Sequence, residues 1–281
     1  MSLLDRMLPR YEYVPLELIE KYSGLNPKET ELRLGKLHRL KLIRKNEVPY
    51  LGYQLTYLGL DCLALKSLAD RDIVKALGDK IGVGKESDIY LGLDPRDERV
   101  IVKFYRIGRT SFRQTQRVRT YVKKPTQSAW LIQSKLSAER EYKALIELYS
   151  KKAYVPKPIG WSRHAVVIEY LEGVELFKIK WLGDPEGVLK KIIETVKIAY
   201  NDVGIVHGDL SEYNIMVVIR DEEEVPLIID WPQYVYKLHP SAENLLIRDI
   251  TYVVKFFNRR FKLRVDVDRA IKYVKGELSE F

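Results

Sequence analysis

The segment 206–214 holds the side chains best suited to chemistry. It reads Val-His-Gly-Asp-Leu-Ser-Glu-Tyr-Asn, so Asp209 precedes Asn214 by five residues, and the apolar stretch 226–229 ends at Asp230. A carboxylate here can accept the proton of an attacking hydroxyl or water, and an amide and a second carboxylate can hold a divalent cation on ATP phosphates. The spacing therefore predicts phosphoryl transfer or nucleotide hydrolysis. His207 is expected to brace the loop.

A glycine-containing run forms a second candidate group. Gly82 and Gly84 stand between two short apolar stretches, and without a Cβ they would let backbone amides approach phosphate oxygens. The hydroxyl of Ser87 could donate to the same phosphates. No Gly-Lys-Ser/Thr run opens a helix, which excludes a Walker loop. Because many hairpins contain glycine, this run is evidence for phosphate binding only in combination with the other motifs.

Lys103 supplies the cation that such a group needs. It lies in Val-Ile-Val-Lys, close to the strand-lysine pattern of protein kinases. Such a lysine requires an anionic partner, for which Glu139 and Glu141 are both available, and Glu141 fits the kinase ion pair better. The alternative is a solvated lysine on a strand edge.

These residues require elements that bring them together, and the apolar periodicity beyond residue 79 predicts them. In chain order we expect strands at 88–93 and 100–104, a helix at 134–149, a hairpin-like pair at 160–170, a helix at 186–203, strands at 215–219 and 226–229, and two final helices. The last two strands would deliver Asp230 to the loop that carries Asp209.

Residues 1–78 show a different pattern, in which short helices precede a hairpin. Helices are expected over 15–22 and 27–40, with Asn26 capping the second. Strands at 42–45 and 52–55 would then form a wing, followed by a helix from 56 to 68. The apolar stripe of the second helix is expected to comprise Leu32, Leu34, Leu37 and Leu40. The pattern favours a winged helix-turn-helix, with this helix for recognition, over a helical bundle with a basic face.

The charge of the 281-residue chain is concentrated in one segment. The formal net charge is +9, and residues 99–138 carry ten Lys and Arg with no acidic residue. A basic excess favours anionic partners, although it can also serve only solubility.

Cys62 is the only cysteine, which excludes an intramolecular disulfide, and no apolar run is long enough for a membrane span. We expect a soluble, cytoplasmic protein.

Together these motifs closely resemble the RIO atypical protein kinases. The resemblance rests on the glycine run with Lys85, Glu86 and Ser87, on Val-Lys103-Phe, on the segment 207–214, and on Ile-Asp-Trp-Pro-Gln over 229–233. The N-terminal pattern and Gly-Arg-Thr-Ser-Phe over 108–112 are similar to the second RIO subfamily.

The resemblance implies an α+β fold of two domains. A winged helix-turn-helix domain would occupy 1–78, and a bilobal kinase-like domain 79–281, with lobes at 79–168 and 172–281. Only 51 residues follow Asp230, with no Ala-Pro-Glu run, so this domain is truncated after the metal-binding loop. An ordinary peptide-binding subdomain is therefore not expected.

The resemblance also implies ATP with Mg²⁺ or Mn²⁺ as cofactors. Lys103, Asp209 and Asp230 would be catalytic, and Asn214 and Asp230 would hold the metal. The nucleotide-binding set would comprise Gly82, Gly84, Lys85, Glu86, Ser87, Lys103, Glu141, and the hinge residues Glu169 and Leu171, which would contact adenine through their backbone.

The family implies a function in maturation of the small ribosomal subunit, with the precursor particle and its rRNA as partners. The phosphate would pass to serine by autophosphorylation, with Ser111 a candidate, transiently to Asp230, or to water. The winged helix and the basic segment would contact nucleic acid, although winged helices also bind proteins. Small-molecule kinases of the aminoglycoside or choline type share His-Gly-Asp-x-x-x-x-Asn and remain the alternative, and a non-enzymatic nucleic-acid binder is a third possibility.

Overall fold

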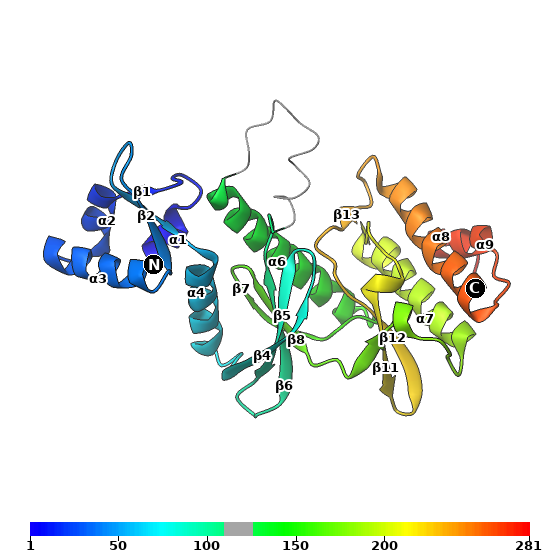
Figure 1. Cartoon of the computed structure of the whole chain (residues 1–281). Coiled ribbons are helices and arrows are strands. Elements are labelled where there is room, and N and C mark those ends of the chain that lie inside the picture. Colours follow the sequence, from blue (N-terminus) through cyan, green and yellow to red (C-terminus); the bar gives the residue numbers. More distant parts are fainter. Residues whose placement is uncertain (110–125) are drawn as a thin grey trace. The chain divides into compact units, whose positions relative to one another are not determined.

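The computed structural model describes residues 1–109 and 126–281, which form two compact units (Figure 1). The first unit comprises residues 1–139 and 159–167, and the second comprises 140–158 and 168–281. Helix α6 (Gln127–Ser150) begins in the first unit and ends in the second.

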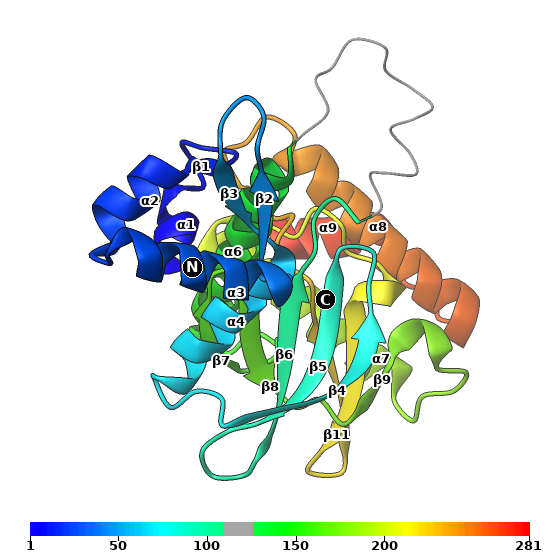
Figure 2. The same cartoon turned by 60° about the vertical axis from the view of Figure 1, so that its left-hand side comes forward.

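The N-terminal part of the first unit is a winged helix, as the sequence predicts (Figure 2). Its elements are α1 (Ser2–Met7), β1 (Val14–Pro15), α2 (Leu16–Ser23), α3 (Pro27–Arg39), β2 (Ile43–Asn46), β3 (Gly52–Leu55) and α4 (Tyr57–Ala69). The Asn26 side chain caps α3 by accepting from the Glu29 amide at 2.9 Å. The strands form a sheet in the order β1-β3-β2.

The apolar stripe predicted for α3 is wrong at two positions. Leu34 is buried, but Leu32 is 72% exposed and Leu40 is 53% exposed. Residues two apart lie about 200° apart around a helix of 3.6 residues per turn, so Leu32 and Leu34 cannot share one face. Leu32 therefore lies on the solvent side of α3.

The rest of the first unit is built on a five-stranded sheet. Its strands are β4 (Ala76–Val83), β5 (Ser87–Leu93), β6 (Arg99–Tyr105), β7 (Pro158–Ser162) and β8 (Ala165–Glu169), in the order β4-β5-β6-β8-β7. The glycine-containing run begins inside a strand, because Gly82 pairs with Ile89 in β4. The turn is therefore confined to residues 84–86.

Helix α6 begins at Gln127, earlier than the predicted 134. Leu131 in its first turns is fully buried and joins the apolar core of the winged helix. Packing against a partner from another part of the chain therefore extends the helix beyond its apparent sequence signal.

Ion pairs fasten α4 to the sheet within the first unit. The Arg106 guanidinium, at the end of β6, contacts both carboxylate oxygens of Asp61 at 2.7 and 2.9 Å and one of Asp88 at 3.0 Å. Arg109 binds Asp88 at 2.6 Å, and Lys135 binds Asp5 at 2.9 Å. Three cations of the acid-free segment 99–138 are thus already paired.

Five other cations of that segment, Arg113, Arg117, Arg119, Lys123 and Lys124, lie outside the described residues, as does the candidate phosphosite Ser111. Among the described residues, no helix is both long and apolar enough to cross a membrane.

The second unit combines short strands with three long helical segments. Besides the end of α6, its elements are β9 (Gly173–Glu175), α7 (Pro185–Ile198), β10 (Ile205–Val206), β11 (Ile215–Arg220), β12 (Glu223–Ile228), β13 (Val235–Tyr236), α8 (Ala242–Phe261) and α9 (Val267–Lys275). Antiparallel sheets form in the orders β12-β11-β9 and β10-β13. Buried side chains of α7, α8 and α9 join those around β10 and β11 in one apolar core.

Candidate phosphoryl-transfer site

The loop after β10 is held by His207. Its Nδ1 accepts the Asp209 amide at 3.2 Å, so the proton lies on Nε2, which donates to the Ile229 carbonyl at 3.1 Å. The ring is 3% exposed and its centre lies 4.6 Å from that of Trp231. His207 thus links the loop to the segment that follows β12 and fixes the backbone at Asp209.

Asp249 holds the same loop from α8, and the sequence analysis did not identify it. Its carboxylate is 1% exposed and accepts the Gly208 amide at 2.8 Å and the Leu210 amide at 3.3 Å. Burial raises the pKa of Asp249, although Arg248 and the loop amides favour its charged form. The available signal was an acidic residue on the apolar face of a helix, between Leu246 and Ile250.

Asn214 is hydrogen-bonded to this loop, and Asp230 directly follows a residue that is hydrogen-bonded to Asn214. The Asn214 amide nitrogen donates to the Asp209 carbonyl at 2.7 Å, and the Ile229 amide donates to the Asn214 carbonyl at 3.0 Å. Strands β11 and β12 pair Ile215 with Ile228, and Asp230 follows with a positive φ of 67°. The second unit therefore brings the predicted base and both predicted metal ligands into one hydrogen-bonded segment.

The donor chemistry of this segment suits Mg²⁺. The Asn214 nitrogen is engaged with the loop, which directs the oxygen as the ligand atom, and Asp230 supplies a carboxylate. Among the described residues, no group of three or more His, Cys, Asp or Glu could hold a metal by itself. Mg²⁺ is commonly held by one or two carboxylates together with substrate phosphates, so this set fits a cation that arrives with ATP.

The nucleotide-binding residues predicted nearer the N-terminus lie in the first unit. Lys103 is in β6 opposite Ile89, and its Nζ lies 4.9 Å from the Tyr105 ring centre. The Gly84 amide donates to the Ser87 carbonyl at 2.9 Å, which closes the turn that contains Lys85 and Glu86. The Glu86 carbonyl also accepts the Arg106 amide at 2.6 Å.

Glu141 lies on α6 in the second unit and is 3% exposed. Its pairing with Lys103, which belongs to the first unit, stays a prediction, as does the joint action of the first-unit residues with Asp209.

At the predicted hinge, both the backbone amide and the carboxylate of Glu169 are already hydrogen-bonded, and its function as a hinge stays a prediction. The Glu169 amide donates to the Lys157 carbonyl at 3.0 Å, and its carboxylate accepts from the Lys157 amide and from Arg220, both at 2.8 Å. Leu171 packs beside Val218. With the Glu169 side chain occupied in this way, any adenine contact here would fall to backbone groups.

Comparison with known proteins decides the family. Residues 88–270 match the RIO domain. The chain belongs to the RIO domain family. Residues 4–71 match a second domain, described as Rio2, N-terminal, which covers the winged helix. The RIO match thus confirms the resemblance, and it does not support the small-molecule kinase alternative.

The relatives of this RIO protein are named as kinases. It is 37% identical over 274 residues to the RIO-type serine/threonine-protein kinase Rio2 of Methanocaldococcus jannaschii, with coverage of 94% of this chain and 98% of that protein. It is also 37% identical to Serine/threonine-protein kinase RIO2 of Saccharomyces cerevisiae, covering 95% of this chain but 64% of the yeast protein. For rio2 of Dictyostelium discoideum, the match spans about half of the relative, 48%. The chain is thus a phosphotransferase of the Rio2 serine/threonine kinase branch.

Solved structures agree with this assignment. The Rio2 kinase from Chaetomium thermophilum, in a structure described as an ADP/Mg²⁺-phosphoaspartate complex, has a TM-score of 0.84 to this chain at 32% identity, covering 99% of this chain and 86% of that one. A second structure of that kinase gives a TM-score of 0.82. The α+β fold of winged helix and kinase-like domain is therefore confirmed.

Proposed function

We propose that this RIO protein transfers the γ-phosphate of ATP to serine on itself or on a partner, or through Asp230 to water. In either case the phosphoryl transfer takes place during maturation of the small ribosomal subunit. The observation that carries the proposal is the hydrogen-bonded segment in which His207 accepts the Asp209 amide and Asp249 accepts the amides on either side of it.

In this proposal Asp209 orients the attacking oxygen and accepts its proton, while Lys103 balances charge on the ATP phosphates. Asn214 and Asp230 would hold Mg²⁺, which supplies charge neutralisation on the phosphates when bound. His207 and Asp249 contribute by keeping the loop backbone in one geometry, so that little reorganisation is required when ATP binds.

Asp230 is also a candidate acceptor. If its carboxylate oxygen attacks the γ-phosphorus, ADP leaves and an acyl phosphate forms, which water then hydrolyses to regenerate the carboxylate. The related Chaetomium kinase structure is described as containing phosphoaspartate, which supports this route. Transfer to serine would instead leave a stable phosphate ester.

The test measures ATP turnover and the chemistry of the labelled protein. Asp209→Ala is expected to lower turnover by about 10²–10⁴-fold, the range for loss of a general base. The matched control is Asp202→Ala, an exposed carboxylate outside the loop, which should turn over ATP like the wild type. Equal turnover by wild type and Asp209→Ala would overturn the proposal.

Hydroxylamine separates the two acceptors, since it cleaves acyl phosphates and leaves serine phosphates intact. Label that hydroxylamine removes, and that Asp230→Asn lacks, would favour the aspartate route. Hydroxylamine-resistant label would favour serine. The ribosomal part is tested by capture from extract with Asp209→Ala, where absence of small-subunit precursor rRNA would contradict it.

A further inference from the structure

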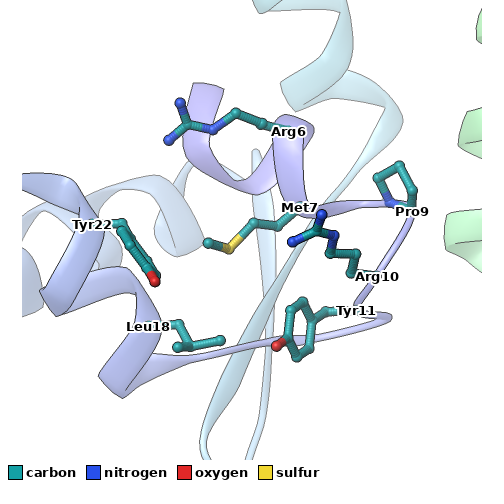
Figure 3. Close-up of a pocket in the computed structure, with 7 residues that line it drawn as sticks. All are labelled: Arg6, Met7, Pro9, Arg10, Tyr11, Leu18 and Tyr22. Atoms are coloured by element: carbon teal, nitrogen blue, oxygen red, sulfur yellow. The ribbon is translucent and has the colours of Figure 1, made fainter.

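A cavity of about 760 Å³ lies in the winged helix, on the side formed by α1, α2 and the segment between them (Figure 3). Its lining residues are Arg6, Met7, Pro9, Arg10, Tyr11, Leu18 and Tyr22. In Figure 3 the side chains of Met7, Leu18, Arg10 and both tyrosines extend into one space, with Arg6 along its upper side. The volume lies within the range of about 300–1,000 Å³ typical of small-molecule sites.

The charge of this cavity is wholly positive. Arg6 and Arg10 line it, no acidic residue does, and within the described residues neither arginine has an ion-pair partner. Asp5, the carboxylate of α1, is 8% exposed and already binds Lys135 and Arg163 at 2.9 and 2.8 Å. A planar guanidinium without a carboxylate partner suits a phosphate, which it can bind through paired hydrogen bonds.

The remaining surface of the cavity is aromatic and apolar. Tyr22 is 52% exposed, and Tyr11 is half-buried with Met7 and Leu18 against the core of the winged helix. The Tyr11 amide donates to the Met7 carbonyl at 3.1 Å, which fixes the backbone that presents the Tyr11 ring. A planar base can stack on such a ring, and unpaired RNA is commonly recognised in this way.

We propose that this cavity binds one unpaired nucleotide of an RNA strand. The base stacks on Tyr11 above the Met7 and Leu18 side chains, and Arg10 binds the phosphate. Arg6 lies along the upper side of the cavity and adds positive charge. This site is separate from α3, the predicted recognition helix, because none of its lining residues comes from α3. This site would add a defined RNA contact to the proposed function. The inference rests on that proposed function for the source of the RNA, but RNA binding at this cavity does not require ATP turnover.

The test uses the full chain and a fluorescein-labelled oligo(A) RNA decamer, with anisotropy measured over a series of KCl concentrations. Tyr11→Leu should weaken binding about tenfold, the size of one base–aromatic stacking contact. Arg6→Ala with Arg10→Ala should flatten the plot of log K against log salt by about 0.7, the effect of one phosphate contact on single strands. Tyr11→Phe, which keeps the ring, should bind like the wild type.

The matched charge control is Arg259→Ala with Arg269→Ala, two exposed arginines of the second unit, which should leave both affinity and salt slope unchanged. A decamer that carries abasic sites should bind wild type as weakly as the intact decamer binds Tyr11→Leu. Thermal melting checks that each variant is folded. If Tyr11→Leu does not fold, the proposal is tested by the Arg6 and Arg10 variant and by the abasic decamer.

Four results would overturn the proposal. They are wild-type affinity in a folded Tyr11→Leu variant, an unchanged salt slope in the Arg6 and Arg10 variant, equal binding of intact and abasic RNA, and displacement of the decamer by a peptide rich in Glu and Tyr at a concentration where free AMP has no effect. Asp209→Ala should bind the decamer like the wild type. Loss of turnover therefore cannot be mistaken for loss of this site.

Discussion

The two units use buried and partly buried carboxylates in different ways. In the first unit, Asp61 and Asp88 lie against the Arg106 guanidinium, so cationic side chains balance their charge. In the second unit, Asp249 accepts backbone amides of the loop, with Arg248 as an added partner. The first arrangement joins two pieces of secondary structure, whereas the second fixes the path of a loop. Similar side chains thus join secondary-structure elements in one place and, in the other, hold the loop that carries the proposed base Asp209.

The largest expected effect comes from breaking the first arrangement. Arg106 is 9% exposed, and Arg106→Ala would leave Asp61 and Asp88 with less compensation for their burial. Removal of one partner from a buried ion pair costs about 3–5 kcal/mol of unfolding free energy. Urea unfolding followed by tryptophan fluorescence measures it.

The control for Arg106 is a surface ion pair in the same unit. Lys66 binds Asp70 at 2.8 Å with side chains 72% and 57% exposed. Lys66→Ala should cost at most about 1 kcal/mol. If the two variants lose equal stability, burial does not distinguish the Arg106 network from an ordinary surface pair.

The second prediction concerns the loop. Asp249→Asn keeps the shape of the side chain but offers one acceptor oxygen in place of two, so one of the Gly208 and Leu210 amides loses its partner. We expect kcat for ATP turnover to fall by about a hundredfold, the loss produced by a displacement of reacting groups of about 1 Å. The KM for ATP should change little, because Asp249 acts through the loop rather than on the nucleotide.

Glu243→Gln is its control, since it removes a carboxylate from the same helix at an exposed ion pair with Lys275. This variant should retain wild-type kcat. A rise in KM with unchanged kcat in Asp249→Asn would contradict the positioning function of Asp249.

The same contrast explains what the sequence could predict. The positions of Asp209, Asn214 and Asp230 follow from a local motif with paired strands, and the structure links them by hydrogen bonds. Asp249 lies 40 residues beyond Asp209, and only tertiary packing brings it to the loop, so no local pattern marks its role. Leu131 likewise begins α6 early because it packs into a core supplied by the winged helix.

The charge pattern of the sequence likewise did not show which cations are paired in the fold. The segment 99–138 has no acidic residue of its own, yet Arg106, Arg109 and Lys135 pair with carboxylates at Asp61, Asp88 and Asp5. These acids lie elsewhere in the sequence, so a count along the chain overstates the charge available to RNA or ATP. Net charge along the sequence therefore does not identify which side chains stay available to an anionic partner.

The smallest expected effect is on the pH dependence of the unfolding free energy, to which Asp88 and Asp249 should contribute with opposite signs. Burial opposes ionisation of Asp88, but hydrogen bonds from Arg109, Lys80 and Arg106 outweigh it and lower its pKa to about 2. Since an unfolded Asp titrates near pH 3.9, Asp88 contributes stability above about pH 4 that is lost as the pH falls toward 2. For Asp249, burial raises the pKa, so its ionised form is a cost that is relieved as the pH falls through the raised value.

Unfolding free energies of wild type, Asp88→Asn and Asp249→Asn, measured between pH 7 and pH 2, should reveal opposite signs. The difference between wild type and Asp88→Asn should shrink on acidification, because the stabilisation that the variant lacks disappears from wild type as well. The difference for Asp249→Asn should instead move in favour of wild type as the native carboxyl becomes protonated. Parallel curves for the two variants would mean that both carboxylates meet the same electrostatic environment, which would remove the distinction between the two units.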